Sequence, residues 1–182
     1  VARDLGVDNS SAKTRRLPTA RQRRNAAAKR AGRITRISNI TRKVRKLHST
    51  GTQPQSTYAH EVQGISDRAM QQFRTQMAKA SGQWRPGCCT TTVIATTSQQ
   101  DDDPLITTTS SHVRAWMELW CRDPSMQPRI RRAWPKIYAH LQAHPKPWMI
   151  VTGPIGAIIL TLRIIHWGAV APDEWVDEQQ QI

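Results

Sequence analysis

The chain has 182 residues and is 38% hydrophobic, which is long enough for one ordinary domain, or for a small domain with a basic extension. Its formal net charge is +14, and Phe, Tyr and Trp together make up only 5% of it, so composition alone does not secure a large packed core. Six of the seven Trp residues lie between Trp116 and Trp175, and we therefore expect the core in the second half.

The excess positive charge lies in one segment. Fourteen Lys and Arg residues and no Asp or Glu occur between Lys13 and Lys46, whereas the other 148 residues hold thirteen basic and thirteen acidic ones. A block of this density is typical either of a disordered basic tail or of a basic helix that faces a polyanion.

Hydrophobic spacing favours the helix. Apolar residues in the block recur three and four positions apart, which predicts a helix over about residues 19–49 with one apolar side. Gly51 and Pro54 are typical of a helix end, and Gly32 would allow a bend. A disordered tail has no reason to keep such a stripe, whose members are Ala27, Ala31, Ile34, Ile37, Ile40, Val44 and Leu47.

The rest of this helix would present a ladder of cations. Phosphates that are neutralised by Lys and Arg release condensed counterions, so nucleic acid is the partner we expect. An anionic membrane would attract the same charges, but the stripe lacks the Trp and Phe anchors of an interfacial helix. The residues predicted to contact phosphates are Lys29, Arg30, Arg33, Arg36, Arg42, Lys43, Arg45 and Lys46.

A second helix is predicted to begin after Ser66, which is a good N-terminal cap, and to end at Gly82. Ile65 and Met70 are placed to pack against each other across this cap. Its apolar face would consist of Met70, Phe73, Met77 and Ala80.

Three motifs occur in a familiar order. "DLGVD" at Asp4–Asp8 precedes the basic helix, "PQSTYAHEVQG" at Pro54–Gly64 follows it, and "RPGCCTT" comes later. This order resembles the region after the catalytic palm of LINE-type (non-LTR) retrotransposon reverse transcriptases, in which a "YLGV"-like strand is followed by a helical thumb and a "P..YG.E.WG"-like stretch. With "VTGPIGAIILTLRIIHWG" further on, it is most like the retroelement open reading frames of dinoflagellates. Ala59, His60 and Gln63 depart from the family pattern.

The resemblance implies a non-catalytic piece of an RNA-directed DNA polymerase. In the family, the metal-binding aspartates precede the "LGV" strand, so they would lie before Val1, and this chain alone is expected to be inactive. Mg would belong to the parent polymerase, and no cofactor is expected here. The partners would be an RNA template and DNA primer duplex and the upstream palm, in a nuclear or cytoplasmic setting. Asp4, Leu5, Gly6 and Val7 would lie near the primer end.

No metal site is predicted. Asp101–Asp103 lie in a Thr- and Ser-rich stretch directly before Pro104, a composition typical of a linker rather than of carboxylates fixed around a metal. The cysteines, Cys88, Cys89 and Cys121, form no CxxC pair, so a zinc knuckle is not expected and reduced thiols are. His140 and His144 have helical spacing without the glutamate of a metalloprotease helix.

The second half predicts further helices with a Trp-rich core. One begins after a Ser110 or Ser111 cap and carries Trp116 and Trp120, and the next contains Pro135, which would kink or split it. The uncharged stretch 147–162 has sixteen residues, fewer than the ~20 of a membrane-spanning helix. Pro154 fits better as the first residue of a buried helix that runs to about Trp167.

Together these features predict a mainly α fold. A thumb-like basic module with a short N-terminal strand would cover residues 1–84, a polar linker 85–110, a Trp-rich helical module 111–170 and an acidic tail 171–182. The expected function is binding of template and primer through the basic helix. The alternatives are a stand-alone basic nucleic-acid-binding protein and, with less support, a membrane-anchored protein that uses residues 148–167.

Overall fold

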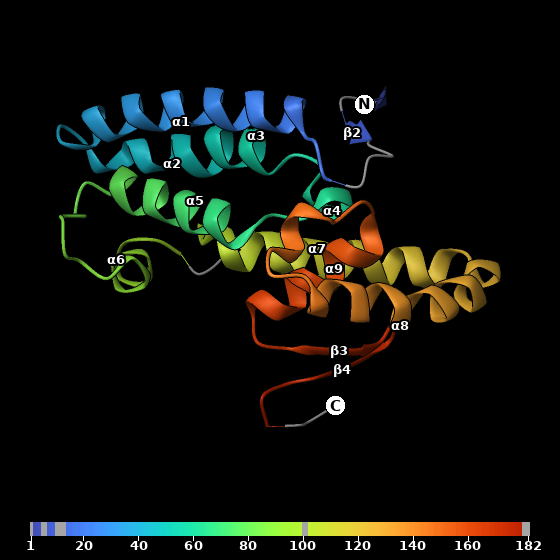
Figure 1. The fold of residues 1–182 in the computed structure, drawn as a ribbon. Coiled ribbons are helices and arrows are strands. Elements are labelled where there is room, and N and C mark those ends of the chain that lie inside the picture. The colour runs from blue at the N-terminus through green and yellow to red at the C-terminus, as the bar shows by residue number, and fades with distance from the viewer. Residues whose placement is uncertain (1, 5–6, 10–13, 100–101, 180–182) are drawn as a thin grey trace.

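The computed structural model describes residues 2–4, 7–9, 14–99 and 102–179. It is mainly helical, which confirms the predicted fold class. A layer formed by the first helices, α1 to α3, lies above α5, and a second group formed by α7, α8 and α9 lies beside and below them (Figure 1). A short sheet of β3 and β4 closes the lower side.

The N-terminal strand is present as a small hairpin. β1 (Ala2–Asp4) pairs antiparallel with β2 (Val7–Asn9). The buried carboxylate of Asp8 accepts a hydrogen bond from the N–H of Ala20 at 3.0 Å, and its carbonyl accepts one from the Gln63 side chain at 3.1 Å. Asp8 therefore caps the following helix from outside it, where a negative charge is favoured by the helix dipole.

Helix α1 (Pro18–Ser38) starts with a proline at its first position and ends well before the predicted residue 49. The carbonyl of Ile37 accepts hydrogen bonds from the N–H groups of Ile40 and Thr41, which closes the turn. The Ser38 hydroxyl donates to the Thr35 carbonyl at 2.7 Å. Gly32 does not interrupt the helix, and the break comes where the chain turns back on itself.

The returning arm consists of a 3-10 turn (Arg42–Val44), α2 (Arg45–Leu47), a π turn (His48–Thr52) and α3 (Gln53–Thr57). The predicted stop near residue 49 is therefore wrong. Pro54 has no N–H to donate, and the wider π turn before it changes the hydrogen-bond register so that the helix passes through the proline.

Folding back also corrects the predicted apolar stripe. Ala27, Ala31 and Ile34 are buried, and Val44 joins the cluster of Ile34 and Ala80. The remaining members are exposed, at 44% for Ile37, 85% for Ile40 and 55% for Leu47. A straight helix would have needed one long partner surface, whereas the turn lets the second arm pack on the first.

After α4 (His60–Gln63), helix α5 (Asp67–Ala80) follows its prediction closely. The Ser66 hydroxyl accepts a hydrogen bond from the N–H of Ala69 at 3.4 Å, which confirms the cap. All four residues of its predicted apolar face, Met70, Phe73, Met77 and Ala80, are buried.

The segment expected to be a polar linker contains ordered helix. α6 (Thr90–Thr97) lies within it, and α7 (Pro104–Arg122) begins seven residues before Ser111. The cap is Asp103, whose carboxylate accepts from the N–H of Leu105 at 2.9 Å. The same carboxylate is paired with buried Arg74 at 3.1 and 3.0 Å, which gives Asp103 a reason to be buried that the local composition did not reveal.

The second half forms the largest core. It is built from α7, α8 (Gln127–Ala143), which continues through Pro135, and α9 (Pro154–Ile164), with 3-10 turns at Pro124–Met126 and Pro147–Met149. The rings of Trp116 and Trp134 lie 5.5 Å apart at its centre, as predicted for the Trp residues.

The start of α9 at Pro154 is also confirmed. β3 (Gly168–Ala171) and β4 (Glu174–Val176) follow, so the predicted acidic tail contains the end of β3 and all of β4. Among the helices that the structure describes, none is long and apolar enough to cross a membrane.

Candidate nucleic-acid interface

A groove of about 1130 Å³ runs between α1 and α5. Arg21 and Arg24 line it from α1, and Arg68 and Lys79 line it from α5. Further polar lining comes from side chains that donate hydrogen bonds, namely Asn25, Ser66, Gln71, Gln72, Thr75 and Gln76.

A second hollow of about 600 Å³ extends this groove. The two share Arg21, Arg24 and Ser66, and the second adds Arg15 and Trp148. Arg16, Leu17, Pro18 and Met149 complete its lining. We call the two hollows together the basic groove, with six cations in its lining: Arg15, Arg16, Arg21, Arg24, Arg68 and Lys79.

No described carboxylate forms an ion pair with these cations, although Asp8 acts on Arg24 at longer range. No Asp or Glu belongs to the described lining, and none of the six cations lies within 4.0 Å of a described carboxylate. Arg74 with Asp103 and Arg131 with Asp173 do form ion pairs, and neither pair lies in the groove. The groove therefore differs from an ordinary salt-bridged surface.

The cations also repel one another. Burial and, to a smaller extent, the charge of nearby Arg24 together lower the pKa of Arg15 to about 10. The pKa of Arg24 is lowered by burial and by Arg21, while Asp8 acts in the opposite direction. Desolvated like charges are unfavourable, and an anion in the groove would offset that cost.

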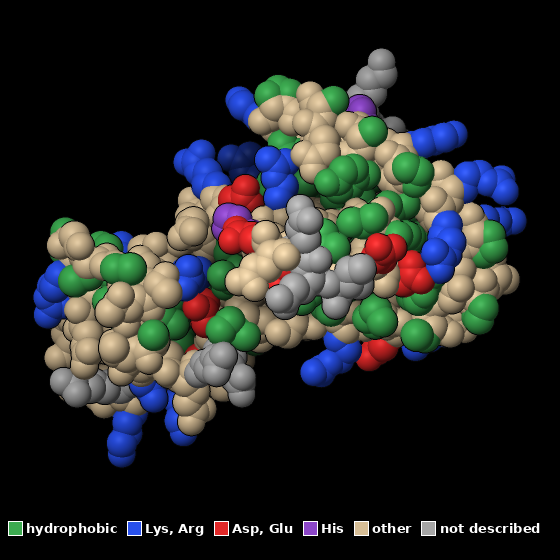
Figure 2. Space-filling model, turned by 90° about the horizontal axis from the view of Figure 1, so that it is seen from below, with side chains coloured by type: hydrophobic (Ala, Val, Ile, Leu, Met, Phe, Trp, Pro, Cys, Tyr) green, Lys and Arg blue, Asp and Glu red, His purple; other side chains and the backbone are tan. Residues whose placement is uncertain are grey.

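The lower face of the molecule has a different character. The face that carries β3 and β4 shows hydrophobic, neutral and acidic side chains, and Lys and Arg project mainly from its edges (Figure 2). The cation-lined groove lies elsewhere, between α1 and α5.

The eight cations predicted from the sequence do not line the basic groove. Lys29, Arg33 and Arg36 are exposed on α1, and Arg30 lies beside Gly51 of the returning arm. On the returning arm, Lys43 and Lys46 are exposed and Arg45 is half-buried. The side chain of Arg42 is outside the described residues. The single ladder is therefore divided between two antiparallel arms.

Of the residues that the resemblance placed near a primer end, Asp4 and Val7 pair with each other in the hairpin. Leu5 and Gly6 lie outside the described residues. The docked residue of this motif is Asp8, which the prediction did not include.

Sequence reasoning missed the groove because its walls come from separate segments. Arg21, Arg24 and Ala28 share one side of α1 by their spacing, and Gln72 and Gln76 repeat in the same way on α5. These patterns were available in the sequence. That the two sides face each other depends on how α1 packs on α5, which no local pattern specifies.

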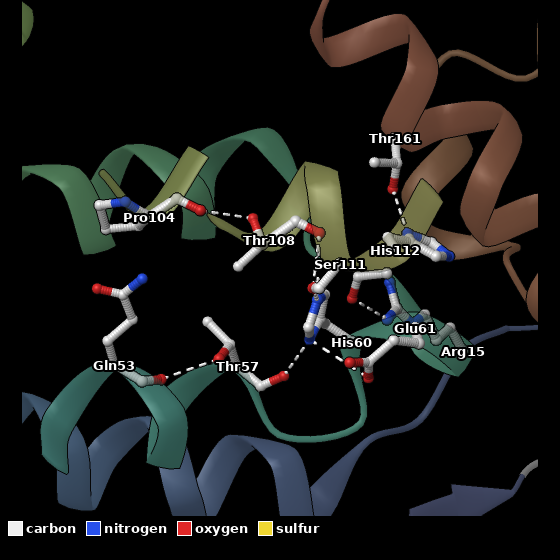
Figure 3. Close-up of polar contacts among 11 residues, drawn as sticks. Arg15, Gln53, Thr57, His60, Glu61, Pro104, Thr108, Ser111, His112 and Thr161 are labelled. Carbon is white, nitrogen blue, oxygen red and sulfur yellow. Dashed lines mark hydrogen bonds and ion pairs between the residues drawn. The ribbon is translucent and has the colours of Figure 1, made fainter. Parts of the chain in front are cut away.

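A second polar cluster joins the two halves of the molecule (Figure 3). His60 Nε2 lies 2.6 Å from the Ser111 hydroxyl, and Nδ1 lies 2.8 Å from the Thr57 carbonyl and 3.4 Å from Glu61. A serine, a histidine and a carboxylate in this order resemble the parts of a nucleophilic site.

The surroundings favour a structural role for this cluster. Ser111 lies inside α7, where its N–H is used by the helix and cannot stabilise an oxyanion. The adjoining cavity is only about 10 Å³, too small for a substrate. His60 instead fastens α4 to α7, and the His112 ring, bonded to Thr161 at 2.9 Å, fastens α7 to α9.

The described residues contain no group of three His, Cys, Asp or Glu side chains that would hold a metal ion. Asp103, the last residue of the Asp101–Asp103 run, forms an ion pair with Arg74. The three cysteines are exposed and unpaired by disulfides. The Mg of a polymerase therefore does not fit the part of this chain that is described, and we assign no chemical step to it.

Comparison with known protein families, with curated proteins and with solved structures finds no match for this chain.

Proposed function

We propose that this protein binds nucleic acid in the basic groove between α1 and α5. The observation that carries the proposal is a continuous groove with six cations, no acidic residue in its described lining, and amide and hydroxyl donors between the charges. Lys and Arg would neutralise phosphates, and Gln and Ser side chains would add hydrogen bonds to phosphates and sugars.

This type of contact does not read a base sequence. The lining offers point charges and flexible amides along a groove, which is how proteins hold a nucleic-acid backbone. The exposed cations on the outer side of α1 would add to the attraction at longer range, within the screening length of the solution.

The resemblance of its motifs extends the proposal to a role. The chain would be the thumb-like part of a LINE-type reverse transcriptase, and it would hold the template and primer duplex while an upstream palm carried out the chemistry. Support comes from the order of the motifs and from a basic helical region where the family has its thumb. The second candidate is a stand-alone nucleic-acid-binding protein, which is favoured by the fact that the groove is formed within this chain.

Salt dependence of binding tests the proposal. Six phosphate contacts predict that the logarithm of affinity falls with the logarithm of salt concentration with a slope of roughly −5. Fluorescence anisotropy of a labelled RNA–DNA hybrid and of duplex DNA would measure it, and a preference for the hybrid would favour the thumb over the stand-alone protein.

Charge-neutral variants locate the contacts. Arg21→Gln with Arg24→Gln should reduce the slope by about 2, whereas Arg129→Gln with Arg132→Gln, two exposed arginines on α8, should leave it nearly unchanged. Equal effects of the two pairs, or binding that does not depend on salt, would contradict the proposal.

A further inference from the structure

Arg15 occupies a fixed position at one end of the basic groove. Its Nη2 donates to the carbonyl of Gln63 and, at 3.0 Å, to that of Gly64. Its backbone N–H donates to the carbonyl oxygen of Met149 at 2.7 Å, and its guanidinium carbon lies 5.7 Å from the centre of the Trp148 ring. These contacts come from two separate segments, residues 63–64 and 148–149, so the side chain is held before any ligand arrives.

Half of the guanidinium is still available. Both side-chain hydrogen bonds use Nη2, and Nε and Nη1 have no acceptor within the part of the chain that is described. The two groups that bond Arg15 are neutral carbonyls, which satisfy donors without balancing the charge. Because Nη2 belongs to both forks of the guanidinium, the free Nε and Nη1 groups would each donate a separate hydrogen bond to a phosphate oxygen rather than form a paired contact.

Gly64 makes this arrangement possible. Its φ is +65°, and a Cβ built on it would lie 2.6 Å from Cζ3 of Trp148, so only glycine fits. The Trp148 ring is held from its other end by a hydrogen bond from Nε1 to Asp67 at 3.1 Å. Trp148 therefore acts as a rigid wall beside Arg15 in the lining of the same hollow.

Arg24 supplies a second charge to this hollow. It lines both parts of the groove and forms no ion pair with a described carboxylate, although Asp8 attracts it from beyond ion-pair distance. It lies near enough to Arg15 to lower its pKa. Two desolvated arginines in one hollow are mutually repulsive, and a shared anion between them would remove that repulsion.

We infer that Arg15 and Arg24 form a discrete binding site for a single phosphate group at the Trp148 end of the basic groove. The inference rests on the proposed function in that it assigns one phosphate of the bound nucleic acid to a defined place. The same chemistry would also accept free inorganic phosphate.

Two probes and two matched variants test the site in the full chain. Equilibrium dialysis with inorganic phosphate at constant ionic strength would measure binding of the free ion, and anisotropy with a labelled duplex would measure the nucleic acid. Arg24→Gln should weaken at least one of these about tenfold or more, since it removes a charge-assisted contact. Arg132→Gln should change each by about twofold or less.

The outcomes separate the possible sources of the phosphate. Loss of free-phosphate binding, with one ion bound per wild-type chain, identifies a site that accepts the free ion, while a specific effect on the duplex alone identifies a phosphodiester site. Arg15→Lys keeps the charge but loses the fixed guanidinium donors, and it should weaken binding of the same probe. Equal effects of Arg24→Gln and Arg132→Gln on both probes would overturn the inference. If the inference is overturned in this way, salt-dependent binding of the duplex would still support the proposed function. If the protein instead binds inorganic phosphate but no duplex, the proposed function is contradicted and the phosphate site is not.

Discussion

Removal of the Asp103 carboxylate should destabilise the protein strongly, although the residue lies in a stretch with the composition of a linker. Asp103 and Arg74 are only 7% and 8% exposed, and they share two hydrogen bonds of 3.1 and 3.0 Å. Asp103→Ala would leave the Arg74 cation buried without a carboxylate, with only the Thr91 hydroxyl as a described acceptor, and would also remove the cap of α7. Breaking a buried pair in this way typically costs 3–5 kcal/mol, and we expect a loss of about 4 kcal/mol.

Urea unfolding followed by circular dichroism would measure this loss. Asp123→Ala is the matched control, because Asp123 also caps a helical turn through the N–H of Ser125, at 3.1 Å, but is exposed and has no described arginine partner. The control should lose about 1 kcal/mol or less. A loss of similar size in both variants would refute the reasoning that the pair is buried and desolvated.

A compensating variant covers the case in which Asp103→Ala does not fold. Arg74→Met combined with Asp103→Asn removes both charges and keeps an oxygen that can cap α7. Since replacing both partners avoids an unpaired buried charge, this double variant should be more stable than Asp103→Ala.

Three further predictions concern the rest of the molecule. Burial lowers the pKa values of His48 and His112 to about 4, whereas both side chains protonate near pH 6.5 in the unfolded chain. The contribution of each neutral histidine to the free energy of unfolding should therefore be fully present above pH 6.5, and roughly 3 kcal/mol of it should be lost as the pH falls toward 4. Urea unfolding at several pH values would measure this loss. His48→Leu should make the free energy of unfolding depend less steeply on pH, and an unchanged dependence would argue against a buried neutral His48. Gly64→Ala should lower the free energy of unfolding by about 2 kcal/mol or more, because residue 64 has a positive φ and an added Cβ would clash with Trp148. The same clash should weaken phosphate binding. An unchanged urea midpoint would contradict the packing described. The double substitution Arg33→Gln and Arg36→Gln, on the outer side of α1, should reduce duplex affinity less than the double substitution Arg21→Gln and Arg24→Gln. The reverse order would indicate that the duplex binds the cations predicted from the sequence rather than the basic groove.

Local signals in the sequence were sufficient for some elements. Ser66 at the start of α5 and Pro154 at the start of α9 each satisfy a need of the first helical turn, so the cap or the proline identifies the boundary without tertiary information. The Trp core of the second half was predictable because Trp116 and Trp120 repeat with the period of a helix.

Boundaries set by tertiary contacts were not predictable in this way. The stripe through Ile37, Ile40 and Leu47 has helical spacing, but the chain gains more by turning after Ser38 and burying Val44 and His48 against α1 and α5. Likewise the start of α7 depends on Arg74, which lies 29 positions before Asp103. The basic groove belongs to this class, since its cations come from α1, from α5 and from the segment before α1.

Site-specific photocrosslinking tests the central claim most directly. A photoreactive amino acid in place of Gln72 would stand in the groove wall on α5, and the same group in place of Gln22 would stand on an exposed position of α1 outside the groove. The account predicts that a bound duplex crosslinks at position 72 and much less at position 22, and that unlabelled duplex suppresses the reaction. Crosslinking at position 22 that equals or exceeds that at position 72 would contradict binding in the groove.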